Sequence, residues 1–152
     1  MSVQPVEIER RVTAMGTALR DAGLRLTHQR LEVVREIAST DEHPDVEAIY
    51  RGVSTRLPTI SLDTVYRTLA VLTEQGLVSR VNATVGPARY DANIERHHHF
   101  VCTRCGSVRD VADPALDAIR APEQTATLGV VEAVEVYLKG VCTSCRSNAA
   151  ST

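Results

Sequence analysis

The sequence is poor in aromatic residues. Its 152 residues include no tryptophan and one phenylalanine, and aromatic residues make up 3% of the chain. A chain of this length can fill one moderate core or two small ones. With so few large rings the packing must be aliphatic, and a metal ion that staples distant segments becomes useful.

A strongly basic balance is also missing. The net charge is −2 and the sequence pI is near 6.2, and a division after Asp91 leaves −1 on either side. Any contact with nucleic acid must therefore come from a local patch of arginines on an acidic surface.

Long apolar runs are absent as well. Residues 1–11 are polar and charged, without an apolar run of the length of a signal sequence, and no later stretch approaches the ~20 apolar residues of a membrane span. We therefore expect a cytoplasmic protein without a membrane partner, in a compartment where thiols stay reduced.

All four cysteines fall into two Cys-x-x-Cys pairs, Cys102 with Cys105 and Cys142 with Cys145. Each pair can place two thiolates on one ion, and together they complete the tetrahedral shell of a structural zinc. Two disulfides would instead need an oxidising compartment. A redox Cys-x-x-Cys usually lies where a strand enters a helix, whereas strand-like residues flank the first pair. The pattern favours zinc.

Four helices and a hairpin are predicted for the first part of the chain. Apolar spacing predicts helices over residues 7–22, 28–40, 45–57 and 62–75, with Thr27 and Ser61 as N-caps. The sequence also predicts two strands, over residues 77–81 and 88–91, joined by a Gly/Pro-containing loop. The predicted buried stripes are Val12, Met15, Leu19 and Ala22 in the first helix, and Leu62, Val65, Leu69 and Leu72 in the fourth.

Helices followed by a two-stranded wing are typical of a winged-helix domain, whose helix before the wing lies in the DNA major groove. On that helix Thr64, Tyr66 and Arg67 are expected to face the DNA, and the arginine suits guanine or phosphate. Arg25 and Arg30 are expected to contact phosphate. The alternative is a helical bundle with an attached hairpin, whose arginines are merely solvated.

The rest of the chain predicts a small α+β module. Strands are expected over residues 99–102 and 108–111, a helix over 114–121, and a third strand within the apolar run 130–141. Residues 147–152 are expected to be disordered. The predicted domains are therefore a winged-helix DNA-binding domain, residues 1–91, and a small metal-binding domain, residues 92–152.

Five further residues offer imidazole and carboxylate ligands of the kind that suits Fe(II), Mn(II) or Zn(II). They are His43, Asp91, His97, His99 and Asp110. In an extended strand His97 and His99 share a face while His98 points away. A lone histidine such as His43 is more often an ordinary surface residue. Because the five residues are spread over both domains, one ion could cross-link them.

Over residues 16–145 the chain resembles the Fur family of bacterial metal-dependent repressors. The matching strings are residues 23–30 (GLRLTHQR), residues 61–69 (SLDTVYRTL), the His-x-His-x-x-Cys-x-x-Cys-Gly run over 97–106, and the final cysteine pair. The resemblance implies a winged-helix repressor that binds double-stranded operator DNA. It also implies a homodimer formed through the C-terminal α/β domain, a four-cysteine structural zinc, and a regulatory Fe(II) or Mn(II) at the hinge.

Within this family the chain is most similar to the peroxide-sensing PerR branch. That resemblance assigns the regulatory ion to His43, Asp91, His97, His99 and Asp110. An aspartate at the position of Asp110 goes with peroxide sensitivity, whereas iron sensors commonly carry glutamate there and at the position of Asp91. The alternative is a plain iron-responsive repressor of iron uptake.

A function of another class is a zinc enzyme, with His97, His99 and a carboxylate around an open metal position. The sequence contains no His-Glu-x-x-His pair, no zinc-deaminase pattern and no nucleophile elbow. We therefore expect a repressor that is not an enzyme and has no organic small-molecule substrate.

Overall fold

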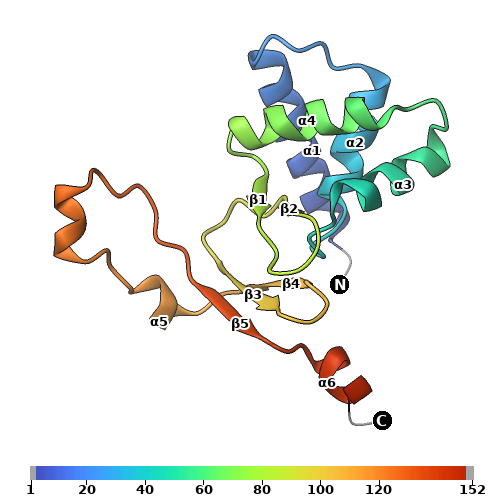
Figure 1. Ribbon diagram of the computed structural model, residues 1–152. Helices are drawn as coiled ribbons and strands as arrows, with labels where there is room; N and C mark the ends of the chain where they lie inside the picture. The colour runs from blue at the N-terminus through green and yellow to red at the C-terminus, as the bar shows by residue number, and fades with distance from the viewer. Residues whose placement is uncertain (1–2, 150–152) are drawn as a thin grey trace. The chain divides into compact units, whose positions relative to one another are not determined.

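The computed structural model describes residues 3–149, which form two compact units (Figure 1). Unit 1 contains residues 3–83 and 87–94, and unit 2 contains residues 84–86 and 95–149. Within this range no helix combines the length and the apolar character that a bilayer crossing needs.

Unit 1 consists of four helices and a two-stranded wing, which confirms the predicted winged helix. Three helices begin at a side-chain cap: Thr27, Asp45 and Ser61 each accept a hydrogen bond from the amide three residues ahead. The elements in chain order are α1 (Pro5–Asp21), α2 (His28–Ala38), α3 (Val46–Arg56), α4 (Leu62–Glu74), and the antiparallel strands β1 (Ser79–Val81) and β2 (Arg89–Asp91).

The core of unit 1 is aliphatic, as the composition requires. α2 packs against the other three helices, and Leu19, Ile37 and Leu69 are among the side chains that are fully buried. Two predicted members of the buried stripes are wrong. Ala22 is exposed just beyond the end of α1, and Leu62, the first residue of α4, is 38% exposed. Both lie at helix ends, outside the packed middle turns.

A buried carboxylate ties α2 to α3. Glu32 is 6% exposed, and its oxygens lie 2.9 Å from Arg56 Nε and 3.1 Å from Arg35 Nη1. Arg56 also reaches Glu36 through Nη2 at 2.7 Å. Gly52 leaves room for that second carboxylate, because a Cβ there would lie 2.0 Å from Glu36 Oε1. The hydrogen bond from Arg56 is the main cause that lowers the pKa of Glu32.

Replacing Arg56 with methionine should lower the free energy of unfolding by about 2 kcal/mol, because a buried carboxylate loses its main partner. The pKa of Glu32 is lower in the folded than in the unfolded chain, so this stabilisation is present above the unfolded value and fades as pH falls through the folded one. Denaturant unfolding of both proteins over a pH series measures the difference. Arg51→Met, at an exposed site on α3, is the control, and equal losses in the two variants would contradict the assignment.

Unit 2 is built on a three-stranded sheet of order β4-β3-β5. The central strand β3 (His98–Cys102) pairs antiparallel with β4 (Val108–Val111) and parallel with β5 (Tyr137–Gly140). A long excursion links β4 to β5 and carries α5 (Pro114–Asp117) and the 3-10 helix η1 (Glu123–Thr127), and α6 (Thr143–Ala149) follows β5 (Figure 1).

The third strand forms within the run 130–141, as predicted, and covers four of its residues. Two other expectations for unit 2 are wrong. The helix from Pro114 ends at Asp117 and not at residue 121, because α5 has no buried side chain whose packing would stabilise a longer helix. Residues 147–149 are helical, since the turn at Cys142 initiates α6 through a hydrogen bond from the Arg146 amide to its carbonyl at 2.9 Å. Residues 150–152 lie outside the described range.

The core of unit 2 is small. Among its described residues the buried apolar side chains are Val101, Cys102 and Val108. Large apolar side chains lie on the surface instead, with Leu128 85% exposed and Val130 94% exposed. So little buried apolar surface cannot by itself stabilise a unit of this size, so further stabilisation must come from a metal or a partner.

Candidate metal centres

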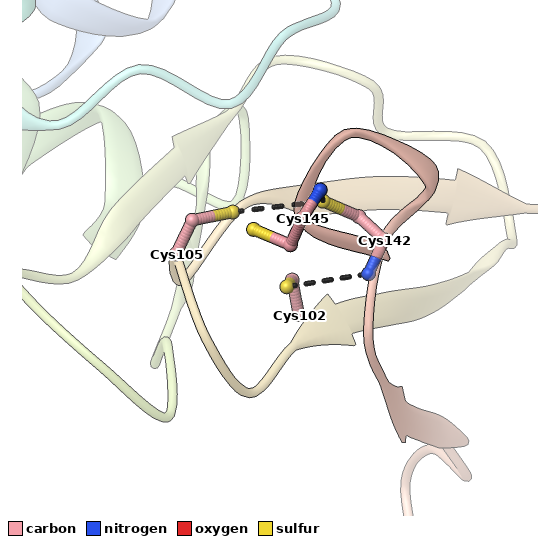
Figure 2. A group of neighbouring side chains, drawn as sticks. All are labelled: Cys102, Cys105, Cys142 and Cys145. Atoms are coloured by element: carbon pink, nitrogen blue, oxygen red, sulfur yellow. Dashed lines mark hydrogen bonds between the residues drawn. The ribbon is translucent and has the colours of Figure 1, made fainter. Parts of the chain in front are cut away.

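The four cysteines converge at one end of the sheet of unit 2 (Figure 2). The four Sγ atoms all lie within 4.8 Å of one another, and Cys105 Sγ is 3.8 Å from Cys142 Sγ. A tetrahedron of sulfurs around zinc, with bonds of ~2.3 Å, has edges of roughly 3.8 Å. All four thiols are free, and a disulfide would need sulfurs ~2 Å apart. The cluster therefore fits a structural zinc.

Backbone amides prepare these sulfurs for a cation. The amides of Arg104 and Cys142 donate to Cys102 Sγ at 3.4 and 3.3 Å. Hydrogen bonds from the amides of Cys105 and Cys142 lower the pKa of the Cys102 thiol to about 6. The neighbouring thiols, Cys142 first, raise the pKa of Cys145 to about 12. Four sulfurs at this spacing cannot all ionise alone, and a divalent cation supplies the missing charge.

A second donor cluster in unit 2 contains His97, His99 and Asp110. The two Nε2 atoms lie 3.1 Å apart, and Asp110 Oδ1 is 3.3 Å from His97 Nε2 and 3.7 Å from His99 Nε2. His99 faces Asp110 directly across the β3–β4 ladder, so the strand register brings their side chains together. Two imidazoles and a carboxylate are donors that suit Fe(II) or Mn(II).

His98 lies on the opposite face of β3 and is fully buried. Its Nδ1 accepts a hydrogen bond from the Val136 amide at 3.1 Å, and its Nε2 lies 3.1 Å from Asp117 Oδ1. The Val136 contact assigns the proton to Nε2. His98 therefore ties α5 and the start of β5 to the central strand.

The remaining two predicted regulatory residues meet in unit 1. His43 Nε2 lies 3.1 Å from Asp91 Oδ2, and both side chains are buried. The loop that carries His43 is held to β2 by the hydrogen bond from the Tyr90 amide to the Pro44 carbonyl at 2.9 Å. Asp91 Oδ1 accepts from the Asn93 amide at 2.8 Å.

His43 has a strained backbone. Its φ of 53° is the one positive value of a non-glycine residue between residues 3 and 149. The left-handed region costs an ordinary residue about 1–2 kcal/mol. Such strain is concentrated at functional sites, where the side chain and not the backbone determines the residue type. Histidine is among the few non-glycine residues that are enriched at positive φ, so this backbone conformation is unusual but tolerated at His43.

The predicted DNA-facing residues all lie in unit 1. On α4, Tyr66 is 49% exposed, and Arg67 is exposed with its Nε 2.9 Å from Asp63 Oδ2. Thr64 is half-buried, and its hydroxyl lies 2.9 Å from that of Ser61. The Arg30 guanidinium donates to the Arg25 carbonyl, which joins the two predicted phosphate contacts.

Sequence reasoning missed Tyr137. Its ring lies against the imidazole of His99, with the ring centroids 5.6 Å apart. No local signal could reveal this contact, because 38 residues separate the two and the parallel β3–β5 register alone brings them together.

The chain was compared with protein-family models, with curated proteins and with solved structures. The model of the ferric uptake regulator family matches residues 21–138. The peroxide-responsive repressor PerR of Staphylococcus epidermidis is 32% identical over 146 residues, which cover 96% of this chain and 97% of that protein. The Helicobacter pylori ferric uptake regulator has the same fold, with a TM-score of 0.74, 23% identity, and coverage of 91% of this chain and 93% of that one. The Pseudomonas aeruginosa regulator, solved with manganese, is 28% identical with a TM-score of 0.66, over 84% and 96% of the chains.

Proposed function

The chain belongs to the ferric uptake regulator family, and on that premise we propose that it is a cytoplasmic repressor that binds operator DNA as a homodimer when a regulatory metal is bound. The cysteine cluster would hold zinc permanently. The regulatory Fe(II) or Mn(II) would be held by His43, Asp91, His97, His99 and Asp110.

The observation that carries this proposal is the division of the donors between the units. Unit 1 holds a buried histidine and aspartate, with the histidine kept in a strained conformation. Unit 2 holds two histidines and an aspartate. Neither set alone fills the five or six positions that Fe(II) and Mn(II) prefer. One ion that takes both sets would fix the units to each other, and its preference for that arrangement would favour DNA binding.

We further propose that the regulatory signal is peroxide. Both carboxylates of the donor set are aspartates, and the PerR repressors of two Staphylococcus species are 32% and 33% identical to the chain over nearly its whole length. The second candidate is an iron-responsive repressor, favoured by the likeness to the P. aeruginosa ferric uptake regulator.

The surface of unit 2 supports a homodimer. β5 is an edge strand of the sheet, and Tyr137, Leu138 and Val141 are each about 40% exposed. The excursion before β5 adds the exposed Leu128 and Val130. A second copy would cover this apolar surface and the unpaired strand edge, which the small core of unit 2 leaves open.

Gel-shift titration with and without Mn(II) tests the proposal, with an operator first selected from random duplexes. Binding should appear only with Mn(II) or Fe(II) and weaken steeply with salt. His43→Ala should lose the metal dependence together with most of the binding. His28→Ala, an exposed histidine at the start of α2, should behave like the unchanged chain. Failure of the metal-loaded chain to bind any duplex would contradict a repressor.

Arg67→Ala should weaken operator binding by about 1–3 kcal/mol, because a direct contact to a base edge has that magnitude. The affinity is measured at fixed salt in Mn(II), with the metal content of each protein determined alongside. Arg120→Ala removes an exposed arginine of unit 2 as a control for net charge. Unchanged affinity for Arg67→Ala would remove this residue from the DNA interface.

A further inference from the structure

β5 places a phenol ring against one of the proposed regulatory ligands. Tyr137 pairs directly with His99 in the parallel β3–β5 ladder, so the two side chains leave the same face of the sheet. Their ring centroids are 5.6 Å apart and the ring planes are inclined by 33°. The His99 amide also donates to the Val136 carbonyl at 3.0 Å. Strand pairing, and not a loop, therefore sets the contact.

The same imidazole faces the other two donors of unit 2. His99 Nε2 lies 3.1 Å from His97 Nε2 and 3.7 Å from Asp110 Oδ1, and the His97 ring meets it nearly edge-on at 4.7 Å. Rotation about the last side-chain bond of a histidine is broad and roughly two-fold. A flip would put the carbon Cε1 in the place of Nε2, and that carbon cannot bind a metal. Whether a ligating nitrogen faces these donors therefore depends on what confines the ring.

Tyr137 is suited to confine it. The phenol is itself fixed, because its hydroxyl donates to Glu135 Oε2 at 3.1 Å. The hydroxyl thus points to an exposed carboxylate while the ring covers the imidazole. The ring and not the hydroxyl makes the contact with His99, which separates the effects expected of removing each.

We propose that Tyr137 is a positioning residue of the regulatory metal site and orients the His99 imidazole so that Nε2 joins His97 and Asp110. The inference rests on the proposed function, which supplies the ion. Groups that orient a metal ligand typically change metal affinity 10–100-fold when they are removed. The fluorescence of Tyr137 should also report whether a metal ion occupies the regulatory site. The chain contains four tyrosines and no tryptophan, so tyrosine emission is not masked.

Mn(II) titration of the full zinc-loaded chain by calorimetry tests the inference. Tyr137→Leu should bind Mn(II) about 10–100-fold more weakly, whereas Tyr137→Phe, which keeps the ring, should stay within about threefold of the unchanged chain. The control is Lys139→Met. Lys139 is exposed and lies on the same face of β5 as Tyr137, but it pairs with Val101 instead of His99. It should bind Mn(II) normally.

Tyrosine emission gives a second readout that a purely structural role would not produce. Mn(II) should change the emission of the unchanged chain, and most of that change should be missing in Tyr137→Phe although its affinity is kept. An equal change in Tyr137→Phe overturns the inference even if Tyr137→Leu fails to fold. If the unchanged chain takes up no Mn(II), the proposed function and this inference fall together. If it binds Mn(II) and a zinc-loaded Tyr137→Leu binds as tightly, only this inference falls.

Discussion

Cys142→Ser should release about one zinc per chain and unfold unit 2. The binding free energy of a structural zinc is folding free energy, on the order of ~10 kcal/mol. Few other interactions can replace it, because unit 2 buries only Val101, Cys102 and Val108 as apolar side chains in its described part. The loss should also disrupt the dimer, whose proposed surface lies on β5, directly before Cys142.

Metal analysis and light scattering of the purified protein measure both effects. Cys102→Ser should behave in the same way, because Cys102 comes from the other pair of the same cluster. Ser144→Ala changes an exposed residue within the second pair and should keep zinc and the dimer. A Cys142→Ser protein with full zinc and normal assembly would contradict a structural role for the cluster.

Peroxide should release the Fe(II)-loaded protein from its operator and leave the Mn(II)-loaded protein bound. The expected lesion is one added oxygen on His43 or His97. The O–O bond of peroxide breaks, one oxygen converts a ring C–H to C–OH, and the other oxygen leaves as water. Loss of one ligand should remove the coupling between metal binding and DNA binding. Couplings of this kind amount to about 1–3 kcal/mol, or 5–150-fold in affinity.

Peptide mass spectrometry after a low peroxide dose, run beside operator binding, tests this expectation. Mn(II)-loaded protein is the matched control, because it has the same ligands without the redox chemistry of iron. Asp110→Glu should reduce the oxidation. If the Fe(II)-loaded chain gains no oxygen on histidine and stays on DNA, the iron-responsive reading replaces peroxide sensing.

Features that depend on neighbouring residues could be predicted from the sequence. Thr27 and Ser61 cap their helices because a hydroxyl three residues before an amide suffices for the contact. The two strands around the first cysteine pair also form as predicted, because they are neighbours in the sequence and pair as a hairpin. Gly106, with a φ of 73°, lies in the turn between them. The winged-helix architecture followed from such local signals.

Features that depend on distant partners could not be predicted. Residues 130–136 have the composition of a strand, but a strand forms only where the chain pairs with β3, and β5 therefore begins at Tyr137. Leu62 has the helical spacing of a core residue and lies at an exposed helix end. The contact of Tyr137 with His99 required knowledge of the strand order. The strain at His43 is likewise visible only in the backbone angles.

The position of β3 would impose an order on the proposed metal loading. Its last residue, Cys102, belongs to the cysteine cluster, and three residues earlier His99 is one of the proposed regulatory ligands. Zinc in the cysteine cluster would anchor the ends of β3 and β5. The register of His99 with Asp110 and Tyr137 depends on these two strands. A chain without zinc would therefore have no formed site for a second ion. In a zinc-starved cell newly made protein would stay unresponsive to iron and manganese. The response of the protein to either metal would therefore depend on the supply of zinc.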